Sequence, residues 1–282
     1  MNIFEAIILG LIQGLTEFLP ISSTGHLTLA GRLMNLISET NPEHWTAFIA
    51  VIQMGTLVAV IYYFWKDLWN IATDFLRDNL IKRKAFSAQS ENSRLGWYII
   101  IGSVPVGIIG LLFKDFIEGA FTKNLQVISF SLIILGLLLA LAEKTGSFKK
   151  EITGIRWLDA FLIGCAQAVS LIPGSSRSGT TITAGLFLGY KREAIARFSF
   201  LLSIPAVMAS GLLEFYHSLE YIDADMALNL AVATIASAIS GYLAIDFLLK
   251  YLKRNSSFIF VYYRVILGAV LLFLIYRGIL QP

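Results

Sequence analysis

The chain has few of the residues that keep a domain in water or cross-link it. Only 15% of its 282 residues are charged, which is too few for a soluble domain of this length. It holds one cysteine, Cys165, so no disulfide can form within the chain. No basic residue precedes the first apolar run, which carries Glu5, so we expect no cleaved signal peptide.

What the sequence holds instead is apolar residues, which make up 56% of the chain and give a mean hydropathy of +0.72. A helix satisfies its own backbone hydrogen bonds in lipid, and runs this long exclude a β-barrel. We therefore predict an all-α polytopic membrane protein. Six runs approach the roughly 20 residues that a bilayer crossing needs; they cover about 46–65, 95–113, 125–142, 198–216, 227–249 and 258–276.

The placement of the charges predicts the orientation in the membrane. Lys and Arg gather in residues 66–94, 143–157, 191–197 and 250–254, whereas residues 214–225 carry acidic residues and no Lys or Arg. Cytoplasmic loops of membrane proteins are enriched in Lys and Arg. We therefore expect the four basic segments to be inside and residues 214–225 to be outside.

Two polar, glycine-bearing stretches interrupt the apolar sequence half a chain apart. Residues 10–26 read GLIQGLTEFLPISSTGH and residues 164–181 read GCAQAVSLIPGSSRSGTT. Each has a Gly, a Gln three residues later, and then a Pro followed by Ser-Ser. Unpaired polar groups are expensive within a membrane, so these stretches need a reason. We expect each to form two short helices, broken near Pro20 or Pro173, with neither piece long enough to span.

The flanking charges determine where each broken stretch begins and ends. Residues 1–36 have to start and finish outside and residues 158–190 inside, so we predict two re-entrant hairpins, one from each face. Each is followed by three spans, which makes residues 1–142 and 158–282 an inverted-topology repeat joined by a cytoplasmic linker at 143–157. Such repeats place binding sites near the middle of the membrane, where broken helices meet.

The residues of the two loops favour an anion, above all a phosphate group. We expect the second short helix of each hairpin to begin at about His26 and Thr180, with free N–H groups and the positive dipole end toward the ligand. Arg177 would add a permanent charge and a bidentate fork; the alternatives for it are snorkelling to the cytoplasmic surface or a structural ion pair. Close backbone approach and further donors would come from Gly25, Gly174 and Gly179 and from Ser22, Thr24, Ser175, Ser178 and Thr181.

Glu17 is the one acidic residue of the first broken stretch, and it lies one helical turn after Gln13. Its carboxylate could hold a divalent cation, Mg²⁺ or Ca²⁺, that bridges phosphate oxygens, with Gln13 as a neutral oxygen ligand. It could instead only neutralise Arg177. With a single carboxylate here, we do not expect a metal bridged by two carboxylates from this motif.

His26 and the loop serines are the candidates for acid–base and nucleophilic chemistry. A histidine this close to Ser-Ser-Thr-Gly favours a general base or acid, with an ordinary structural histidine as the alternative. Ser23 and Ser176 hold matching places in the two loops, so one could be a nucleophile, or both could be phosphate donors. Gln53, in the first span, either faces the site or serves packing.

Residues 15–26 (LTEFLPISSTGH) and 173–181 (PGSSRSGTT) resemble the two signature regions of the undecaprenyl-diphosphate phosphatase family, membrane enzymes tied to bacitracin resistance. The resemblance runs through the whole chain in length, motif order and apolar pattern. It implies hydrolysis of undecaprenyl diphosphate to the monophosphate carrier of cell-wall synthesis, a divalent cation, and an active site open to the outer side of the plasma membrane. By motif, Glu17 corresponds to the essential glutamate, Ser23 and His26 to the serine and histidine, and Ser176, Arg177 and Thr181 to the phosphate-binding set.

The combined hypothesis places the polyprenyl tail in the bilayer and the diphosphate between the hairpins. Arg177, the loop donors and a metal at Glu17 would stabilise the transferred phosphoryl group, while His26 activates Ser23 or a water, or protonates the leaving phosphate. The main alternative is a transporter or flippase, because broken helices in inverted repeats are common in transporters. A channel ranks last, since the full-length spans lack a polar stripe. The expected partners are the lipid substrate and the bilayer, with no nucleic acid and with a homodimer left open.

Overall fold

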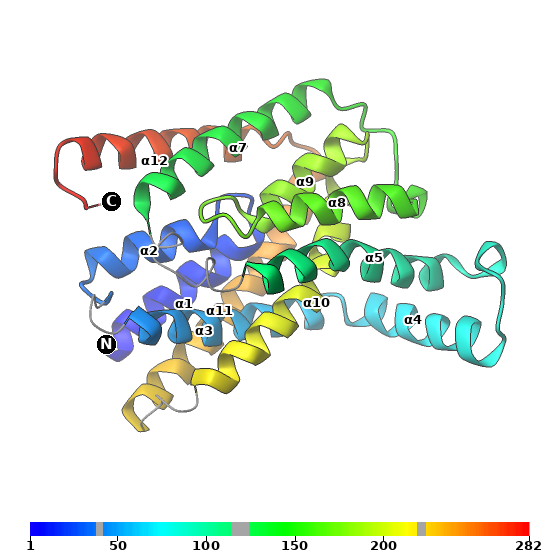
Figure 1. The fold of residues 1–282 in the computed structure, drawn as a ribbon, viewed down its shortest axis with the longest axis horizontal. Helices are drawn as coiled ribbons and strands as arrows, with labels where there is room; N and C mark the ends of the chain where they lie inside the picture. Colours follow the sequence, from blue (N-terminus) through cyan, green and yellow to red (C-terminus); the bar gives the residue numbers. More distant parts are fainter. Residues whose placement is uncertain (38–41, 114–123, 219–223, 282) are drawn as a thin grey trace.

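The computed structural model describes residues 1–37, 42–113, 124–218 and 224–281, which form a bundle of α-helices (Figure 1). The predicted all-α class is confirmed for these residues, where an isolated β-bridge joins Lys150 and Tyr190. The α-helices are α1 (Ile3–Phe18), α2 (Ser23–Leu33), α3 (Pro42–Tyr63), α4 (Trp65–Leu76), α5 (Glu91–Leu112), α7 (Leu125–Thr145), α8 (Trp157–Val169), α9 (Arg177–Phe187), α10 (Arg192–Ser218), α11 (Ala224–Leu252) and α12 (Phe258–Tyr276).

Six of these helices are long and apolar enough to cross a membrane, which confirms the six predicted spans. The apolar segments lie in α3, α5, α7, α10, α11 and α12. The largest boundary difference is at α10, which begins at Arg192, six residues before the predicted start of its span at 198. Its first turns carry charged residues, so a criterion based on apolarity cannot detect them.

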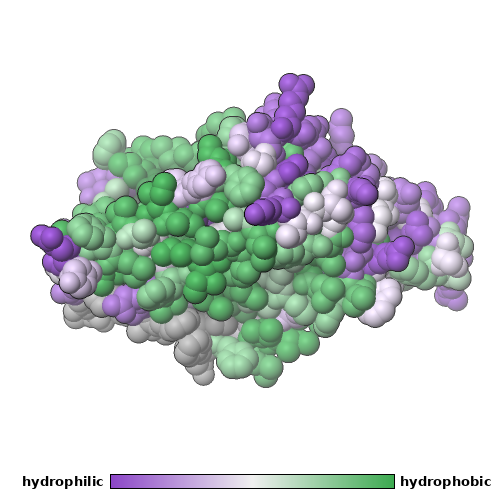
Figure 2. Space-filling view, turned by 90° about the horizontal axis from the view of Figure 1, so that it is seen from above, coloured by the Kyte–Doolittle hydropathy of each residue, from purple (hydrophilic) through white to green (hydrophobic). Residues whose placement is uncertain are grey.

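The surface of the bundle is that of a multi-pass membrane protein. Large apolar side chains are exposed on the spans, including Leu111 at 77% and Ile266 at 63%. Figure 2 shows a broad hydrophobic band, with hydrophilic residues gathered toward the end of the molecule where α4 connects to α5. An apolar surface of this extent requires lipid around it. The predicted outside loop, 214–225, falls partly on residues 219–223, which lie outside the described residues.

The basic segment 66–94, predicted to connect two spans, is helical in its first part. Residues Trp65–Leu76 form α4, followed by a π-helical turn at Arg77–Ile81. Helix α4 lies against α5, with the rings of Phe75 and Trp97 5.1 Å apart. Its charged residues resemble those of a loop. The residues that pack on α5 recur at helical spacing, so they do not form a continuous apolar run in the sequence.

The centre of the bundle is built from α1, α3 and α11 packed closely together. A Cβ atom on Gly14 of α1 would lie 2.0 Å from Ser240 Oγ, and one on Gly10 would lie 2.2 Å from the Ala233 carbonyl oxygen. Small residues let helices approach one another in a membrane, where van der Waals packing drives association. This packing fixes α1, and with it Glu17 near the end of the helix.

Two helix pairs bring their loops together in the middle of the bundle. The first helix pair, α1–α2, approaches from one end of the molecule, and the second, α8–α9, approaches from the other (Figure 1). The predicted division of each broken stretch into two short helices is confirmed. The first loop (residues 19–22) meets the second loop (residues 170–176) and the start of α9, where the Ser178 hydroxyl donates to the Leu19 carbonyl at 3.1 Å.

Candidate functional site

Each loop ends in a serine that caps the following helix. Ser22 and Ser176 have positive φ angles, 75° and 67°. Their hydroxyl oxygens accept the backbone N–H of Gly25 at 3.3 Å and of Gly179 at 3.1 Å. Positive φ is uncommon for serine and persists only where the surrounding structure holds it. The two loops therefore share an unusual cap geometry.

The caps correct the predicted register between the two loops. Because Ser22 and Ser176 occupy the same cap position, Ser23 corresponds to Arg177. The predicted match of Ser23 with Ser176 is wrong by one residue, since the second loop has one more residue between its proline and its cap. Both α2 and α9 also begin three residues before their predicted starts, which places Gly25 and Gly179 in the first helical turn.

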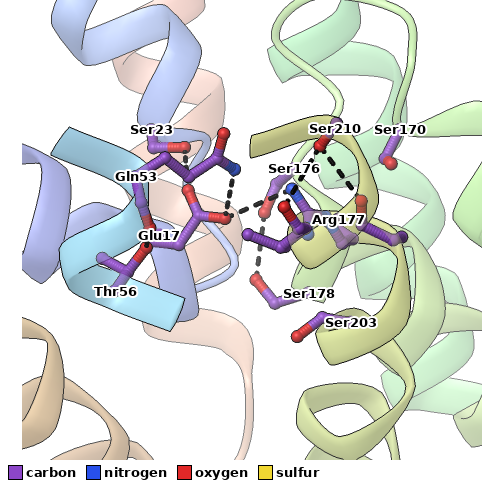
Figure 3. A network of polar contacts seen from close by, with 12 residues as sticks. Glu17, Ser23, Gln53, Thr56, Ser170, Ser176, Arg177, Ser178, Ser203 and Ser210 are labelled. Carbon is purple, nitrogen blue, oxygen red and sulfur yellow. Dashed lines mark hydrogen bonds and ion pairs between the residues drawn. The ribbon is translucent and has the colours of Figure 1, made fainter. Parts of the chain in front are cut away.

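Glu17 is the hub of the polar contacts between the loops (Figure 3). Its Oε2 accepts the Ser23 hydroxyl at 2.7 Å and the Gln13 amide at 3.0 Å. Its Oε1 accepts the Gln53 amide at 3.1 Å and forms an ion pair with Arg177 Nη2 at 3.3 Å. The carboxylate thus joins residues from α1, α2, α3 and α9. The ion pair that was one alternative for both Glu17 and Arg177 is present, and Gln53 faces the site.

A cavity of about 60 Å³ lies beside this hub, with room for several water molecules. Its wall contains residues from both loops and from α3. The lining residues are Glu17, Ser22, Ser23, Thr24, Gln53, Ser170, Ile172, Gly174, Ser175, Ser176 and Arg177.

Two donors in the cavity wall have no hydrogen-bond partner among the described residues. They are Arg177 Nη1 and Ser175 Oγ, and both atoms are buried. Buried polar groups in proteins are nearly always bonded, so an unbonded guanidinium nitrogen beside a cavity requires an explanation. Phosphate oxygens are acceptors of the kind that an arginine fork binds. The residues that line the cavity thus include two donors that the protein itself leaves unbonded, both of them buried behind its surface.

Two residues predicted to contact phosphate point elsewhere. Thr181 is fully buried; its hydroxyl donates to the Arg177 carbonyl at 2.7 Å and contacts Ser199 Oγ at 2.5 Å. Ser178 contacts the first loop at Leu19. Neither side chain lines the cavity. In this geometry both residues hold α9 in place rather than contact a ligand.

The three loop glycines also have protein neighbours where ligand contact was predicted. A Cβ on Gly174, which has a φ of 85°, would lie 2.5 Å from the Ile128 carbonyl oxygen of α7. A Cβ on Gly25 would lie 3.2 Å from Ile128 Cγ2, and one on Gly179 would lie 2.6 Å from Arg264 Nη1. The glycines therefore make room for α7 and α12, and only Gly174 also lines the cavity.

His26 is engaged away from Ser23. Its Nδ1 lies 2.7 Å from the Ser22 carbonyl oxygen and its Nε2 2.6 Å from the Tyr263 hydroxyl, with the two rings stacked at 5.5 Å. A carbonyl can only accept, so Nδ1 carries the proton, and in the neutral ring Nε2 accepts from Tyr263. The position of a base beside Ser23, predicted for His26, is taken by Glu17.

The oxygen ligands in the cavity wall can be compared with those that a divalent cation requires. Glu17 is the one carboxylate in the cavity wall, and the described ranges contain no group of three His, Cys, Asp or Glu side chains that could hold a metal. Mg²⁺ is commonly held by one or two carboxylates together with substrate phosphates and water, whereas a Ca²⁺ cage needs more protein oxygens. The residues fit a cation that binds at Glu17 together with a phosphate ligand.

A second, smaller cavity lies across the Glu17–Arg177 ion pair. Its volume is about 10 Å³, enough for roughly one water molecule. Glu17 and Arg177 line both cavities, so their ion pair separates the two spaces. The remaining lining residues of the small cavity are Phe18, Ser178, Ser199, Phe200 and Ser203.

Three polar residues at or near the loops were not predicted from the sequence. Ser170 lines the main cavity, Tyr263 holds His26, and Arg264 lies behind both loops with no exposed surface. Arg264 had a usable signal, because an arginine inside an apolar span is rare and is a functional candidate by default. Ser170 and Tyr263 had none, since their partners depend on tertiary contacts.

Comparison with known proteins gives full-length matches. The family model for the bacitracin resistance protein BacA matches residues 6–270. An undecaprenyl-diphosphatase of Syntrophobacter fumaroxidans is 58% identical over 277 residues, which cover 98% of this chain and 99% of that protein. Undecaprenyl-diphosphatases of Chlorobium phaeovibrioides and Myxococcus xanthus are 47% and 48% identical over all of this chain, covering 100% and 92% of those proteins.

Proposed function

The chain belongs to the bacitracin resistance protein BacA family, and on that basis we propose that it is a membrane phosphatase that hydrolyses undecaprenyl diphosphate. The products are undecaprenyl phosphate and inorganic phosphate. Recycling of this carrier supports cell-wall synthesis and confers resistance to bacitracin. Two of the undecaprenyl-diphosphatases match this chain over 98% and 100% of its length, which supports the same activity for the whole chain.

One observation carries the proposal: an activated hydroxyl and free phosphate donors share one cavity. Ser23 Oγ lies 2.7 Å from the Glu17 carboxylate, and the cavity wall also holds the unbonded Arg177 Nη1 and Ser175 Oγ. A hydroxyl beside a base is the arrangement of nucleophilic catalysis, whereas anion binding alone does not require it. Donors fixed before the substrate arrives stabilise developing charge at no cost of reorganisation.

In the first step, Ser23 Oγ attacks the terminal phosphorus of the diphosphate. A bond forms between Oγ and phosphorus while the bond from phosphorus to the bridging oxygen breaks, and undecaprenyl phosphate leaves as an anion. The Ser23 proton passes to Glu17 Oε2. Arg177 Nη1 and Ser175 Oγ donate to the oxygens of the transferred phosphoryl group.

In the second step, a water molecule attacks the same phosphorus. The bond to Ser23 Oγ breaks, Glu17 returns its proton to that oxygen, and inorganic phosphate leaves with both protons of the water. His26 takes no proton in either step; it holds the Ser22 carbonyl and thereby the strained cap next to the nucleophile.

A divalent cation at Glu17 would neutralise part of the diphosphate charge when bound. We propose that it enters with the substrate, because the cavity offers one carboxylate and neutral oxygens such as that of Gln53. Glu17 and Gln53 would then be its protein ligands, and phosphate oxygens and water would supply the rest.

The finer topology belongs to the same proposal. The two helix pairs are re-entrant hairpins, and residues 1–142 and 158–282 form an inverted repeat around the site, with residues 143–157 as a cytoplasmic linker. The protein lies in the plasma membrane with its cavity open to the outside, and a homodimer is its proposed assembly. The meeting of the loops in the middle of the bundle supports the two opposed hairpins and the inverted repeat (Figure 1).

The test is phosphate release from a short polyprenyl diphosphate by purified protein in detergent, with and without a chelator. The wild type should release phosphate in a metal-dependent reaction, and Arg177→Ala should abolish it. Arg192→Ala is the matched control, because Arg192 pairs with a buried carboxylate, Glu143, away from the cavity. Well-folded wild type that releases no phosphate with any of several divalent cations would refute the phosphatase proposal.

The second candidate is a transporter of the lipid, and the small cavity across the Glu17–Arg177 ion pair favours it. Glu17 and Arg177 line both cavities, and a transporter likewise holds its ligand at a site between two spaces. Detergent removes the two compartments that transport needs, so phosphate release in the assay cannot arise from transport. Absence of release, together with lipid movement across reconstituted vesicles, would support the transporter.

A further inference from the structure

Arg264 of α12 is a buried arginine that the proposed chemistry does not use. Its side chain has no exposed surface, although it lies within a candidate membrane span. Among the described residues it forms no ion pair, so its charge is balanced by backbone dipoles alone. An arginine in this position is expensive and marks a functional requirement.

The guanidinium donates to backbone carbonyls of both loops at once. Its Nη1 reaches the Pro20 carbonyl of the first loop at 3.4 Å. Its Nη2 reaches the second loop at the Gly174 and Ser175 carbonyls, at 3.4 and 3.0 Å. The same side chain also donates to the carbonyls of Ser131 and Leu132 in α7. One residue thus connects the two loops to each other and to a spanning helix.

These bonds also orient the peptide groups of the second loop. The peptide bond between Ser175 and Ser176 is trans, so its N–H points away from the carbonyl that Arg264 holds. Gly174, Ser175 and Ser176 all line the cavity. The N–H of the preceding peptide group, that of Ser175, donates to the Ile172 carbonyl at 3.2 Å, so Arg264 and this turn together fix both peptide groups of the loop.

The close approach of Arg264 to the first turn of α9 depends on the glycine at position 179. A Cβ atom at position 179 would lie 2.6 Å from Arg264 Nη1, the atom that bonds to Pro20. Any larger residue there would displace this nitrogen from the first loop. The glycine is therefore required by the arginine, independently of any ligand.

We propose that Arg264 is a positioning residue that ties the first loop to the second and thereby sets the distance between the Ser23–Glu17 pair and the phosphate donors of the second loop. It touches neither substrate nor reacting atoms, and this inference rests on the proposed phosphatase function. Misplacement of reacting groups by about 1 Å can cost 100-fold in rate. Loss of the tie should therefore lower kcat and also weaken binding of the diphosphate, because the phosphate donors of the second loop are no longer held opposite Ser23 and Glu17.

The experiment compares Arg264→Met, which removes charge and donors, with Arg264→Lys, which keeps a charge but lacks the planar fork. Arg277→Met on the same helix is the matched control, because Arg277 is exposed at the C-terminal cap of α12. Each protein is assayed in detergent at the same interval below its own thermal midpoint, so that a loss of stability alone does not lower the rate. We expect kcat to fall about 100-fold for Arg264→Met, with partial rescue by Arg264→Lys and no change for Arg277→Met.

A second readout does not depend on turnover. Inorganic diphosphate should raise the thermal midpoint of the wild type, since a ligand stabilises the state that binds it. The shift should be lost in Arg264→Met and retained in Arg277→Met. If Arg264→Met does not fold, Gly179→Ala takes its place, because it displaces Nη1 from Pro20 while keeping the charge, and it should lower kcat by a similar factor.

Two results would overturn the proposal. One is a wild-type kcat and diphosphate shift in folded Arg264→Met or Gly179→Ala. The other is a loss of rate that disappears once each variant is assayed at the matched interval below its midpoint, which would make Arg264 a stabilising residue only. A wild type that binds diphosphate but releases no phosphate would refute the phosphatase instead, and the midpoint shifts would still test Arg264.

Discussion

The first and second helix pairs share a scaffold and differ in their chemistry. In each, a serine with positive φ caps the second helix through the N–H of a glycine. At the next position, however, the first pair has Ser23 and the second has Arg177. On the first helix of each pair, Gln13 is bonded to a carboxylate, whereas Gln167 is fully buried and neither of its amide atoms has a partner among the described residues.

The cap geometry and the reactive groups can therefore vary independently of each other. The cavity needs a carboxylate and a hydroxyl on one wall and a guanidinium on the other, which two identical loops would not supply. Similar caps place these different residues at equivalent points, facing one another across the ion pair of Glu17 and Arg177. The comparison can be tested by changing matched residues in the two pairs.

The largest effect is expected for Glu17→Gln, which removes the group that makes the first pair different. General base catalysis contributes about 10²–10⁴-fold, so kcat for phosphate release should fall by about 10³-fold. Glu143→Gln is the control, because Glu143 is a buried carboxylate paired with Arg192 outside the cavity. It should lower the thermal midpoint and leave kcat within threefold. A Glu17→Gln enzyme with more than a tenth of wild-type kcat would remove Glu17 from the mechanism.

Smaller effects are expected at the two glutamines, and they concern different quantities. Gln13→Leu should lower kcat, whereas Gln167→Leu should raise the free energy of unfolding. Gln13→Leu removes a hydrogen bond to a charged group worth about 1.5–3 kcal/mol, so kcat should fall about tenfold or more. Gln167→Leu removes a buried amide without partners, so the free energy of unfolding in a denaturing-detergent titration should rise by about 1 kcal/mol. Equal losses of kcat in Gln13→Leu and Gln167→Leu would show that the two glutamines contribute equally to catalysis.

The cap serines should give equal effects if the scaffolds are alike. Ser22→Ala and Ser176→Ala each remove one cap bond, which is worth about 0.5–2 kcal/mol of stability. Ser257→Ala is the matched control, since Ser257 occupies the N-cap of α12 without a side-chain cap bond. If the losses of unfolding free energy in Ser22→Ala and Ser176→Ala differ by more than about 1.5 kcal/mol, the width of that range, the two caps are not equivalent.

The smallest effect is expected for Tyr190, which follows α9 of the second helix pair. Its hydroxyl donates to Asp159 of α8 at 2.7 Å. Burial, and then this hydrogen bond, raise the pKa of Tyr190 above its usual value of 10. The unfolded chain therefore ionises first, so the stability that Tyr190 adds is complete below pH 10 and declines as the pH rises above it. Thermal midpoints of wild type and Tyr190→Phe should differ most below pH 10 and converge above it. A constant difference across that range would show that ionisation of Tyr190 is not involved.

Much of the fold could be predicted from the sequence because it depends on local properties. The six spans follow from apolar length, and the two helix pairs follow from Pro20 and Pro173 within apolar sequence. Helix α4 was not predicted, because its charged residues Lys66, Asp67 and Asp74 resemble those of a cytoplasmic loop. Its place on α5 depends on contacts such as that of Phe75 with Trp97, which no local pattern contains.

The residues of the site could be identified from the motifs, but their directions could not. Ser23 and Arg177 occupy the same first position of α2 and α9, and only the structure shows that Arg177 faces Glu17 while Thr181 contacts Ser199. His26 meets Tyr263, a residue 237 positions away, and only the tertiary structure shows that Glu17 is the nearer base. A side chain's orientation depends on where its helix begins, and boundaries are the least certain part of any prediction from sequence.

The contact between Gly179 and Arg264 also limits how descendants of this chain can change. A methyl group at position 179 would displace the guanidinium, and loss of the guanidinium would leave that space empty. Whichever substitution comes first therefore bears nearly the whole loss, and the second adds little, because neighbours that share one space do not act additively. We therefore expect positions 179 and 264, which lie 85 residues apart, to be conserved together while the site is under selection. Once the site is no longer needed, both positions should be free to change.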